Sequence, residues 1–286
     1  MPDFGIFRGF NDKLFGNKLY AGQLPTQLGK IGSENFGYLY LLNDYPNAAA
    51  AYSLRKLRSA YTGSAIRVRR ASDNTEQDIG FVNNVLDTSS LTSFCSGTNG
   101  FVTTWYDQSG NGYNATNGNA VSQPQIVSSG SVILENGQPT INFSVSKELQ
   151  TGLFASVISQ PNTYFITVNK ANHNGYLFET SGGGARQAQG DDTWVFAGSV
   201  ALGFYPTADL GSQKLLTILF DGGSSISRIN SIAKGSGNPG SNGQGGIRFG
   251  RNANSYNMQE FIIYQGNQTN NFSGIETNIN SFYSIY

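Results

Sequence analysis

Aromatic and planar polar side chains are concentrated in one stretch of this sequence, between residues 176 and 205. Proteins bind sugars with aromatic faces that stack on the ring and with carboxylate, amide or guanidinium groups that hydrogen-bond the hydroxyls. The stretch therefore predicts a carbohydrate-binding site. Its candidate residues are Tyr176, Glu179, Arg186, Asp191, Asp192 and Trp194. The alternative is that these residue types only reflect the exposed strands of an all-β domain.

The turn at residues 107–112, after the β-prone run 101–106, could hold a cation. Asp107, Ser109 and Asn111 present oxygens at alternating positions, as calcium-binding loops do. One carboxylate supplies little charge for Ca²⁺, and Asp and Asn side chains readily hydrogen-bond their own backbone in turns. We therefore expect a hydrogen-bonded turn and no cofactor, with Ca²⁺ as the alternative.

The overall charge and composition exclude several classes of function. The chain has 286 residues, 18 basic and 18 acidic, so its formal net charge is zero. Nucleic-acid binding requires clustered Lys and Arg, so no nucleic acid is expected as a partner. No apolar run resembles an export signal or a membrane span, which predicts a protein made in a cytoplasm, with no membrane as a partner. The single cysteine, Cys95, and the single histidine, His173, exclude Cys-based and multi-histidine metal sites.

Residues 1–45 differ in character from the rest of the chain, because large apolar side chains alternate with glycines. Burying each such side chain contributes about 1.5–3 kcal/mol, so the segment is expected to dock on something. We predict an anchoring and oligomerisation arm over residues 1–45 and a separate domain over residues 46–286. The attachment candidates are Phe4, Phe7, Phe10, Leu14, Phe15, Leu19 and Leu24. The alternative is that the segment covers the chain's own domain.

Three helices are predicted from capping residues and spacing. Asn47 is a common N-cap type, and the alanine-rich run 48–58 has helical periodicity. Asp87 is expected to cap a short helix before Cys95. Ser273 and Glu276 have capping-box spacing, which predicts a closing helix.

The remaining pattern is that of strands. Residues 65–70 alternate between apolar and basic side chains, residues 77–82 read as the returning strand, and 101–106 is β-prone with Trp105 expected in the core. From residue 120 onward, short β-prone runs are separated by Gly, Asn and Ser turns. These features predict an all-β sandwich with a few short helices and an extended N-terminal arm.

Two blocks of sequence together resemble the catalytic domain of α-L-arabinofuranosidase B enzymes. The first is Ala51–Gly63 followed by Ile66–Asp73, and the second is Phe94–Thr98 leading into Tyr106–Gly112. The resemblance covers about residues 48–118. It implies a concanavalin A-like β-sandwich, or jelly roll.

The same resemblance shows where catalytic carboxylates would be missing. The family's nucleophile segment is similar to residues 176–184, which place Gly184 at the position of the glutamate. The family's acid/base segment is similar to residues 250–254, which place Asn252 at the position of the aspartate. Retaining hydrolysis needs one carboxylate to attack and another to protonate the leaving group, so we expect no hydrolysis. We count Asn252 among the carbohydrate-binding candidates instead.

Two consequences follow from these departures. A displaced carboxylate pair that uses Glu179, Asp191 or Asp192 is the alternative that would restore activity. The family's disulfide would also be absent, because Cys95 is present but Gly100 stands where its partner would be. A reduced cysteine agrees with assembly in a reducing cytoplasm.

The start of the chain favours a particular setting. Residues 4–10 and 21–26 resemble the beginning of bacteriophage structural proteins that carry such a domain. We therefore predict a non-enzymatic virion protein, made in the host cytoplasm: a head fibre, capsid decoration or tail-associated subunit. Its expected partners are copies of itself, capsid or tail proteins bound through the arm, and host or environmental glycans. The alternatives are a glycoside hydrolase with arabinofuranosidase-like activity and a bacterial carbohydrate-binding adhesin.

Overall fold

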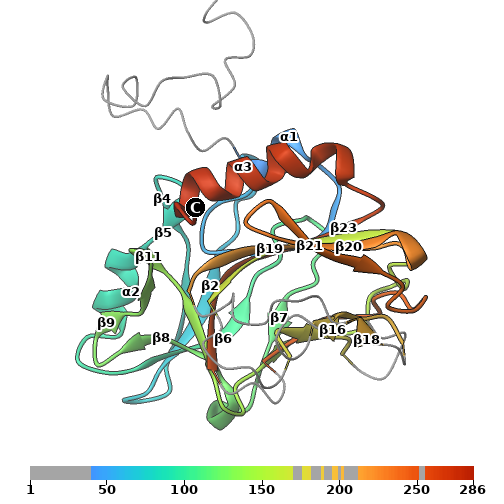
Figure 1. Ribbon diagram of the computed structural model, residues 1–286. Helices are drawn as coiled ribbons and strands as arrows, with labels where there is room; N and C mark the ends of the chain where they lie inside the picture. The colour runs from blue at the N-terminus through green and yellow to red at the C-terminus, as the bar shows by residue number, and fades with distance from the viewer. Residues whose placement is uncertain are drawn as a thin grey trace, which may run out of the picture. The chain divides into compact units, whose positions relative to one another are not determined.

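The computed structural model describes residues 40–169, 176–181, 188–189, 195–198, 201–202, 212–250 and 255–286. Antiparallel pairing runs through 19 strands, which fold into a large and a small layer (Figure 1). The predicted all-β sandwich with a few short helices is confirmed. The predicted arm lies outside the described residues, and the division at residues 45 and 46 stays a prediction.

The large layer contains most of the long strands. In order of pairing they are β3 (Glu76–Ile79), β2 (Ile66–Arg70), β6 (Gly100–Trp105), β8 (Gln125–Ser128) with β9 (Ser131–Val132), β12 (Ile141–Ser144), β23 (Ser255–Gln265) with β1 (Ala48–Ser53), β14 (Asn162–Asn169), β19 (Lys214–Phe220), β20 (Ser225–Ile229) and β21 (Ile232–Gly237). The predicted strands at 65–70 and 101–106 are β2 and β6. The eleven-residue β23 pairs with β14 along one side and with β1 and β12 along the other.

The small layer is built from two-residue strands. They are β7 (Ala115–Thr116), β13 (Leu149–Gln150), β22 (Arg248–Phe249), β15 (Phe178–Glu179), β16 (Ala188–Gln189), β17 (Val195–Phe196) and β18 (Ala201–Leu202). Two separate hairpins lie beside the layers: β4 (Phe81–Val82) with β5 (Val85–Leu86), and β10 (Leu134–Glu135) with β11 (Gln138–Pro139).

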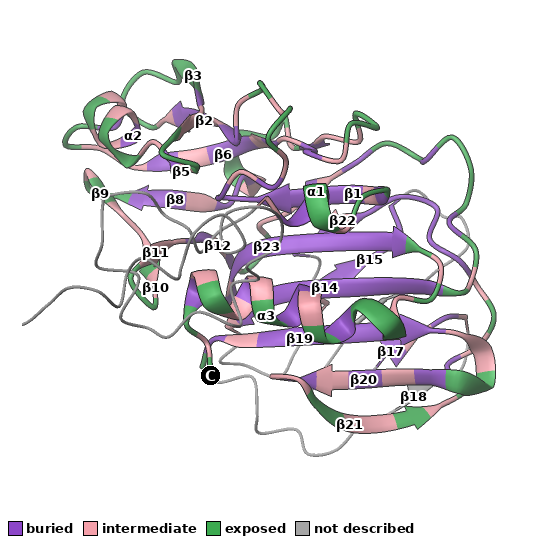
Figure 2. Ribbon diagram, turned by 90° about the horizontal axis from the view of Figure 1, so that it is seen from above, coloured by how far each residue is buried: buried purple, intermediate pink, exposed green. Residues whose placement is uncertain are grey.

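Two hydrophobic clusters hold the sandwich together. The first lies between the layers and contains Trp105, whose ring is 5.7 Å from those of Tyr52 and Phe249. Trp105 is fully buried, as predicted. The second lies on the outer face of the large layer, where α3 (Phe272–Tyr283) covers Ile262 and Phe165. Figure 2 shows β23, β14 and β19 buried beneath this helix.

The predicted helix over residues 48–58 is wrong, because residues 48–53 form β1. Five of the six residues of β1 are buried, and they belong to both clusters: Tyr52 faces the core between the layers and Ala51 faces α3. A strand that is covered on both faces lacks the alternation of apolar and polar residues that marks a half-exposed strand. The signal that remained in the sequence was the high helix propensity of alanine. Asn47 adopts φ 66° and is not a helix cap.

The other two predicted helices are present in the structure. Asp87 caps α2 (Thr88–Phe94) by accepting a hydrogen bond from the Ser90 backbone N–H. The closing helix is α3, but its capping box does not form. Glu276 instead accepts hydrogen bonds from Thr217 and Arg228. A third helix, α1 (Leu41–Asp44), packs two buried leucines into the cluster beneath α3. No helix in the described part of the chain is long and apolar enough to cross a membrane.

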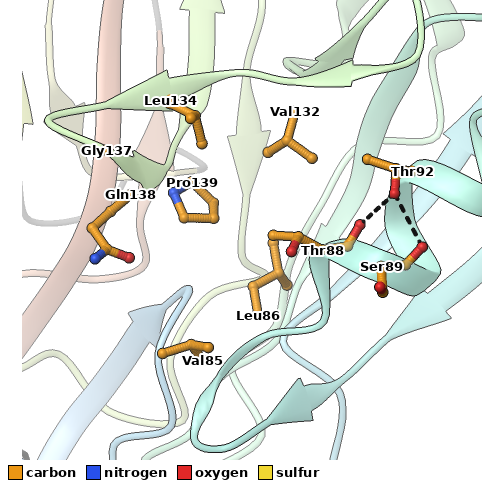
Figure 3. A pocket seen from close by; sticks show the side chains of 10 residues that line it. All are labelled: Val85, Leu86, Thr88, Ser89, Thr92, Val132, Leu134, Gly137, Gln138 and Pro139. Carbon is orange, nitrogen blue, oxygen red and sulfur yellow. Dashed lines mark hydrogen bonds between the residues drawn. The ribbon is translucent and has the colours of Figure 1, made fainter.

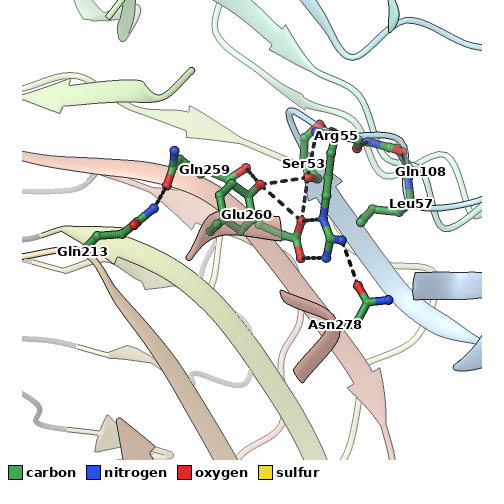
Figure 4. A network of polar contacts seen from close by, with 9 residues as sticks. Ser53, Arg55, Leu57, Gln108, Gln213, Gln259, Glu260 and Asn278 are labelled. Carbon is green, nitrogen blue, oxygen red and sulfur yellow. Dashed lines mark hydrogen bonds and ion pairs between the residues drawn. The ribbon is translucent and has the colours of Figure 1, made fainter. Parts of the chain in front are cut away.

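A buried ion pair connects β1, β23 and α3 (Figure 4). Arg55 donates two hydrogen bonds to Glu260, at 2.7 and 2.9 Å, and a third to Asn278 at 2.8 Å. Ser53 donates to the same carboxylate at 2.7 Å. The ring of Tyr283 lies 5.7 Å from the guanidinium. Because the network joins Ser53 and Arg55 to Glu260 of β23 and to two residues of α3, Asn278 and Tyr283, it fixes α3 on the sheet.

Candidate functional site

The small layer presents a row of polar side chains on its outer face. Phe249 on β22 pairs with Phe178 on β15, and both are buried in the core. The neighbouring register joins Gln150, Arg248 and Glu179 across β13, β22 and β15. Side chains alternate along a strand, so this second row faces away from the core.

Arg248 lies at the centre of this row. Its Nε and Nη2 donate to Gln150 Oε1 at 3.2 and 3.0 Å. Its Nη1 is 3.6 Å from Glu179 Oε1, and its Nε is 3.8 Å from Glu148 Oε2. The Glu179 side chain is 2% exposed, whereas that of Glu148 is 32% exposed and that of Arg248 is 26% exposed. One guanidinium therefore has carboxylates from two different segments beside it.

This arrangement has the chemical groups for glycoside hydrolysis. The two carboxylates approach nitrogens of the same guanidinium, so they lie within roughly 10 Å of each other, which includes the separations that glycoside hydrolases use. Their environments differ, because Glu179 is buried and Glu148 reaches solvent. Pairs of carboxylates in unlike surroundings are suited to unlike roles, one fixed beside the sugar and one exchanging protons.

An aromatic pair continues the outer face beyond Glu179. Glu179 pairs with Ala188 on β16, and Ala188 pairs with Phe196 on β17. The flanking Val195 is in the core, so Phe196 faces outward with Glu179. The Tyr176 ring lies 6.4 Å from the Phe196 ring at 63°, and both residues are half-buried.

The structure describes two of the predicted site residues: Glu179 lies beside Arg248, and the Tyr176 ring lies beside that of Phe196. The other candidates lie outside the described residues: Arg186, Asp191, Asp192, Trp194 and Asn252, as does Gly184. Sequence reasoning missed four residues of the outer face, namely Glu148, Gln150, Arg248 and Phe196. Their only signal was local, a polar residue on either side of Leu149 and a single arginine between two core residues.

The 107–112 turn hydrogen-bonds the edge of β1 that lies opposite β23. Asp107 Oδ1 accepts from the backbone N–H groups of Ala51 and Ser109, and Oδ2 accepts from Ser109 Oγ and the Tyr113 N–H. Asn111 Nδ2 donates to two carbonyls of β1. A carboxylate has about four acceptor positions, so Ca²⁺ would have to displace these donors. No cluster of three metal-ligating side chains occurs among the residues that the structure describes.

Cys95 is buried and unpaired in the structure. Burial raises the pKa of its thiol, and the charge of Arg70 opposes this in part. A Cβ added at Gly100 would lie 2.7 Å from Cys95 Sγ. Gly100 therefore occupies the place from which a second cysteine could reach Cys95, as the resemblance implied.

A groove of ≈ 510 Å³ lies away from the small layer, between α2 and the β10–β11 hairpin (Figure 3). It is lined by Val85, Leu86, Thr88, Ser89, Thr92, Val132, Leu134, Gly137, Gln138 and Pro139. These side chains include no carboxylate, histidine or cysteine. The groove consequently lacks a group that could act as an acid, a base or a strong nucleophile.

Comparison with known proteins finds a family match for part of the chain, which ends before Glu148 and Glu179. Residues 38–136 match the family model described as alpha-L-arabinofuranosidase B, catalytic. A probable α-L-arabinofuranosidase B of Aspergillus flavus is 39% identical over 80 residues, which cover 27% of this chain and 16% of the relative. The corresponding protein of Aspergillus terreus is 38% identical over 98 residues, covering 32% and 19%. The matched segment is thus less than a fifth of the length of these relatives.

Solved structures extend the similarity to the whole sandwich. An arabinofuranosidase complexed with arabinofuranosyl-α-1,2-xylobiose matches with a TM-score of 0.64 and 18% identity, covering 82% of this chain and 62% of the other. A mutant α-L-arabinofuranosidase soaked with 4-nitrophenyl α-L-arabinofuranoside matches with the same score and coverage. At this identity the match shows the fold, which is the β-sandwich of these enzymes.

The prediction of a non-enzymatic virion protein is wrong. The matching family model describes a catalytic domain, and relatives that match the chain are fungal arabinofuranosidases. The expected location in a virion, and the roles of head fibre, capsid decoration or tail-associated subunit, are overturned with it. Gly184 and Asn252 were matched to the family's carboxylate positions by residue type alone, and such a match does not exclude carboxylates elsewhere in the chain. Homo-oligomerisation and the attachment residues Phe4 to Leu24 stay predictions, since they lie outside the described part of the chain.

Proposed function

We propose that this protein is a glycoside hydrolase that cleaves α-L-arabinofuranosides with Glu179 and Glu148. The observation that supports it best is the pair of carboxylates beside Arg248 on the outer face of the small layer. The match of residues 38–136 to a catalytic arabinofuranosidase domain supports the choice of sugar.

The surroundings of the two carboxylates suggest their roles. Glu179 is held on β15 between the backbone of β22 and the guanidinium of Arg248, so its carboxylate has a fixed position. A fixed negative charge stabilises the positive charge that develops on the sugar in the transition state, and it can also attack the anomeric carbon. Glu148 is exposed enough to exchange protons with water, which a general acid/base must do. Gly184 and Asn252 take no part in this mechanism.

The test is the release of 4-nitrophenol from 4-nitrophenyl α-L-arabinofuranoside. We expect turnover by the wild-type protein, and a kcat lower by about 100- to 10,000-fold in both Glu179→Gln and Glu148→Gln. The matched control is Glu76→Gln, which removes a carboxylate paired with Arg67 at 3.3 Å on the large layer and should leave kcat unchanged. Absence of turnover above buffer, or full activity in both site variants, would refute the proposal.

Azide separates the two roles. A small anion can replace a nucleophilic carboxylate where its side chain has been cut back, so azide should restore turnover to Glu179→Ala and yield a glycosyl azide if Glu179 attacks the sugar. Proton NMR of the first sugar released shows whether the anomeric configuration is retained. Retention is the outcome expected for a nucleophilic Glu179.

A further inference from the structure

We infer that the outer face of the large layer binds an acidic saccharide, a sugar chain that carries a carboxylate group. The residues that form this site are Arg69, Phe101, Gln125, Asn142 and Lys147. The first four lie on β2, β6, β8 and β12, whereas the carboxylates proposed for hydrolysis lie on the small layer. The inference therefore goes beyond the proposed function and does not depend on it.

Strand register places four of these residues in one row. Arg69 of β2 pairs with Phe101 of β6. Gln125 of β8 pairs with Phe101 on one side and with Asn142 of β12 on the other. The residues beside them along each strand are in the core: Val68, Val102, Ile126, Ile141 and Phe143. Because side chains alternate along a strand, the row faces outward, and it spans three strand spacings, roughly 14 Å. Figure 2 shows these strands beyond the part of the layer that α3 covers.

Arg69 is a buried cation without a counter-ion. Arg55 and Arg69 are the two buried arginines of the described residues, 3% and 9% exposed. Arg55 is paired with a carboxylate, whereas Arg69 donates only to neutral oxygens. These belong to the side chains of Gln123 (2.7 Å) and Asn74 (2.8 Å) and to the backbone of Ala120 (3.2 Å). A buried charge is costly without an opposite charge, so an anion bound at Arg69 would be stabilised there.

Lys147 brings a second unpaired cation to the same place. Its Nζ donates to the carbonyl of Val121, next to the carbonyl that Arg69 bonds, in the turn η4 (Ala120–Ser122). The Lys147 Nζ lies 5.9 Å and the Arg69 guanidinium 5.0 Å from the centre of the Phe101 ring. None of the ion pairs within the described residues involves either cation. The two charges therefore form one positive spot, and the Phe101 ring helps to hold both in position.

The other end of the row is neutral and can bond hydroxyl groups. Gln125 Nε2 donates to the Val127 carbonyl at 2.9 Å, and Asn142 Nδ2 donates to Asn257 Oδ1 at 2.8 Å. The amide oxygens of Gln125 and Asn142 accept no hydrogen bond within the described part of the chain and are not enclosed, so they are open to a ligand. Asparagine is depleted in strands, so the pair Asn142 and Asn257 departs from the local preference, as residues at binding sites do.

The distribution of charge selects the class of ligand. Nucleic acids and anionic membranes carry many charges and bind to extended basic clusters, whereas this chain has a formal net charge of zero. The row offers two cations at one end and uncharged amides at the other. It matches a ligand that has one carboxylate among many hydroxyls, which is the chemistry of a uronic acid in a sugar chain.

The experiment is calorimetric titration of the whole protein with trigalacturonate and, as the matched ligand, with its methyl ester. The ester keeps every ring and every ring hydroxyl but has no negative charge. We expect trigalacturonate to bind, and the Kd of the ester to be at least about 10-fold higher, because the ester cannot make charge-assisted hydrogen bonds. Equal affinity for the two ligands, or no binding of trigalacturonate, would refute the inference.

Variants of the two cations locate the site. Arg69→Gln should raise the Kd for trigalacturonate by about 10- to 100-fold. Lys147→Gln should raise it by about 2- to 5-fold, because its cation is only half-buried. If Arg69→Gln does not fold, the Lys147→Gln result decides. An unchanged Kd in the folded variants would overturn the inference.

The matched control is Lys56→Gln. Lys56 is also half-buried, and its Nζ lies 5.7 Å from the centre of the Tyr40 ring, with no ion pair among the described residues. This variant removes a comparable cation from another part of the molecule and should leave the Kd for trigalacturonate unchanged. An effect as large as that of Lys147→Gln would mean that the ligand responds only to the total charge, and it would refute the site.

The amides distinguish a saccharide from a small anion. Gln125→Ala should raise the Kd for trigalacturonate by about 2- to 10-fold, as loss of one hydrogen bond implies. If Gln125→Ala and Asn142→Ala bind trigalacturonate as the wild-type protein does, and inorganic phosphate at equal concentration displaces it, the site takes a free oxyanion and the inference is wrong.

Competition separates this inference from the proposed function. An excess of methyl α-L-arabinofuranoside should not displace trigalacturonate, because the carboxylates proposed for hydrolysis lie on the other layer. Displacement would place the acidic saccharide at Glu179 and would overturn the inference. A failure to hydrolyse arabinofuranosides, with trigalacturonate still bound at Arg69, would refute the proposed function alone.

Discussion

Two arginine–glutamate pairs lie on opposite outer faces of the sandwich, and they differ in how fully they are closed. Arg55 and Glu260 meet at 2.7 and 2.9 Å beneath α3, with side chains 3% and 0% exposed. Arg248 and Glu179 meet at 3.6 Å on the small layer, where the arginine is 26% exposed. The first pair is covered by a helix, whereas the second has Glu148 beside the same guanidinium.

The difference shows what each pair can do. In the closed pair the guanidinium bonds Glu260 twice and Asn278 once, and Ser53 donates to the same carboxylate. Such a network has donors and acceptors matched to one another, which stabilises one arrangement of β1, β23 and α3. In the open pair the guanidinium hydrogen-bonds a neutral amide, Gln150, and has two carboxylates beyond hydrogen-bonding distance. An arginine in that setting can hold carboxylates in place while a ligand approaches.

The largest expected effect is on the closed pair. Glu260→Gln leaves the charge of Arg55 buried without its counter-ion, so we expect the free energy of unfolding to fall by about 3–5 kcal/mol. Urea denaturation measures this change, and kcat per folded molecule should stay at the wild-type value. The control is Glu76→Gln, whose exposed pair with Arg67 should contribute less than about 1 kcal/mol. A loss below 1 kcal/mol in Glu260→Gln would mean that the closed pair is not a structural connection.

A smaller effect is expected from Tyr283, whose hydroxyl lies 3.3 Å from Glu260 Oε2. Burial, and then the charge of Glu260, raise the pKa of Tyr283 well above its usual value of 10. Above pH 10 the unfolded chain loses this proton while the folded chain retains it, so stability falls as pH rises. In Tyr283→Phe the free energy of unfolding should therefore decline less steeply above pH 10, by up to about 1.4 kcal/mol per pH unit. Parallel curves for the two proteins would show that Tyr283 titrates alike in both states.

The comparison also shows what the sequence could reveal. Strands with clear alternation were predicted, such as β2, and so was the burial of Trp105. The run that forms β1 was predicted as a helix, because burial on both faces removed the alternation that marks a strand. Arg55 was placed in that helix, so its pairing with Glu260, 205 positions away, could not be foreseen.

The candidate site was predicted only where it is local in sequence. Tyr176 and Glu179 lie in one stretch, and their residue types suggested carbohydrate chemistry. Arg248 lies in β22, about 70 positions from Glu179, and Glu148 directly precedes β13, about 30 positions away. The register of such two-residue strands leaves almost no sequence signal. A glycine at position 184 does not exclude carboxylates elsewhere, and only folding brings Glu148 to the guanidinium that also lies beside Glu179.

The open pair, Arg248 and Glu179, is expected to contribute least to stability while affecting activity, in contrast to the closed pair. In a double-mutant cycle of Arg248→Gln and Glu179→Gln, the coupling in the free energy of unfolding should be about 1 kcal/mol or less, because the pair is long and partly solvated. The kcat of Arg248→Gln should nevertheless fall by about 10- to 100-fold, since Glu179 and Glu148 lose the charge that holds them in position. Arg248→Lys keeps that charge without the fork of donors, so part of the activity should return. A coupling of 3 kcal/mol with unchanged kcat would make this pair a second structural connection, and the contrast between the two faces would then have no functional meaning.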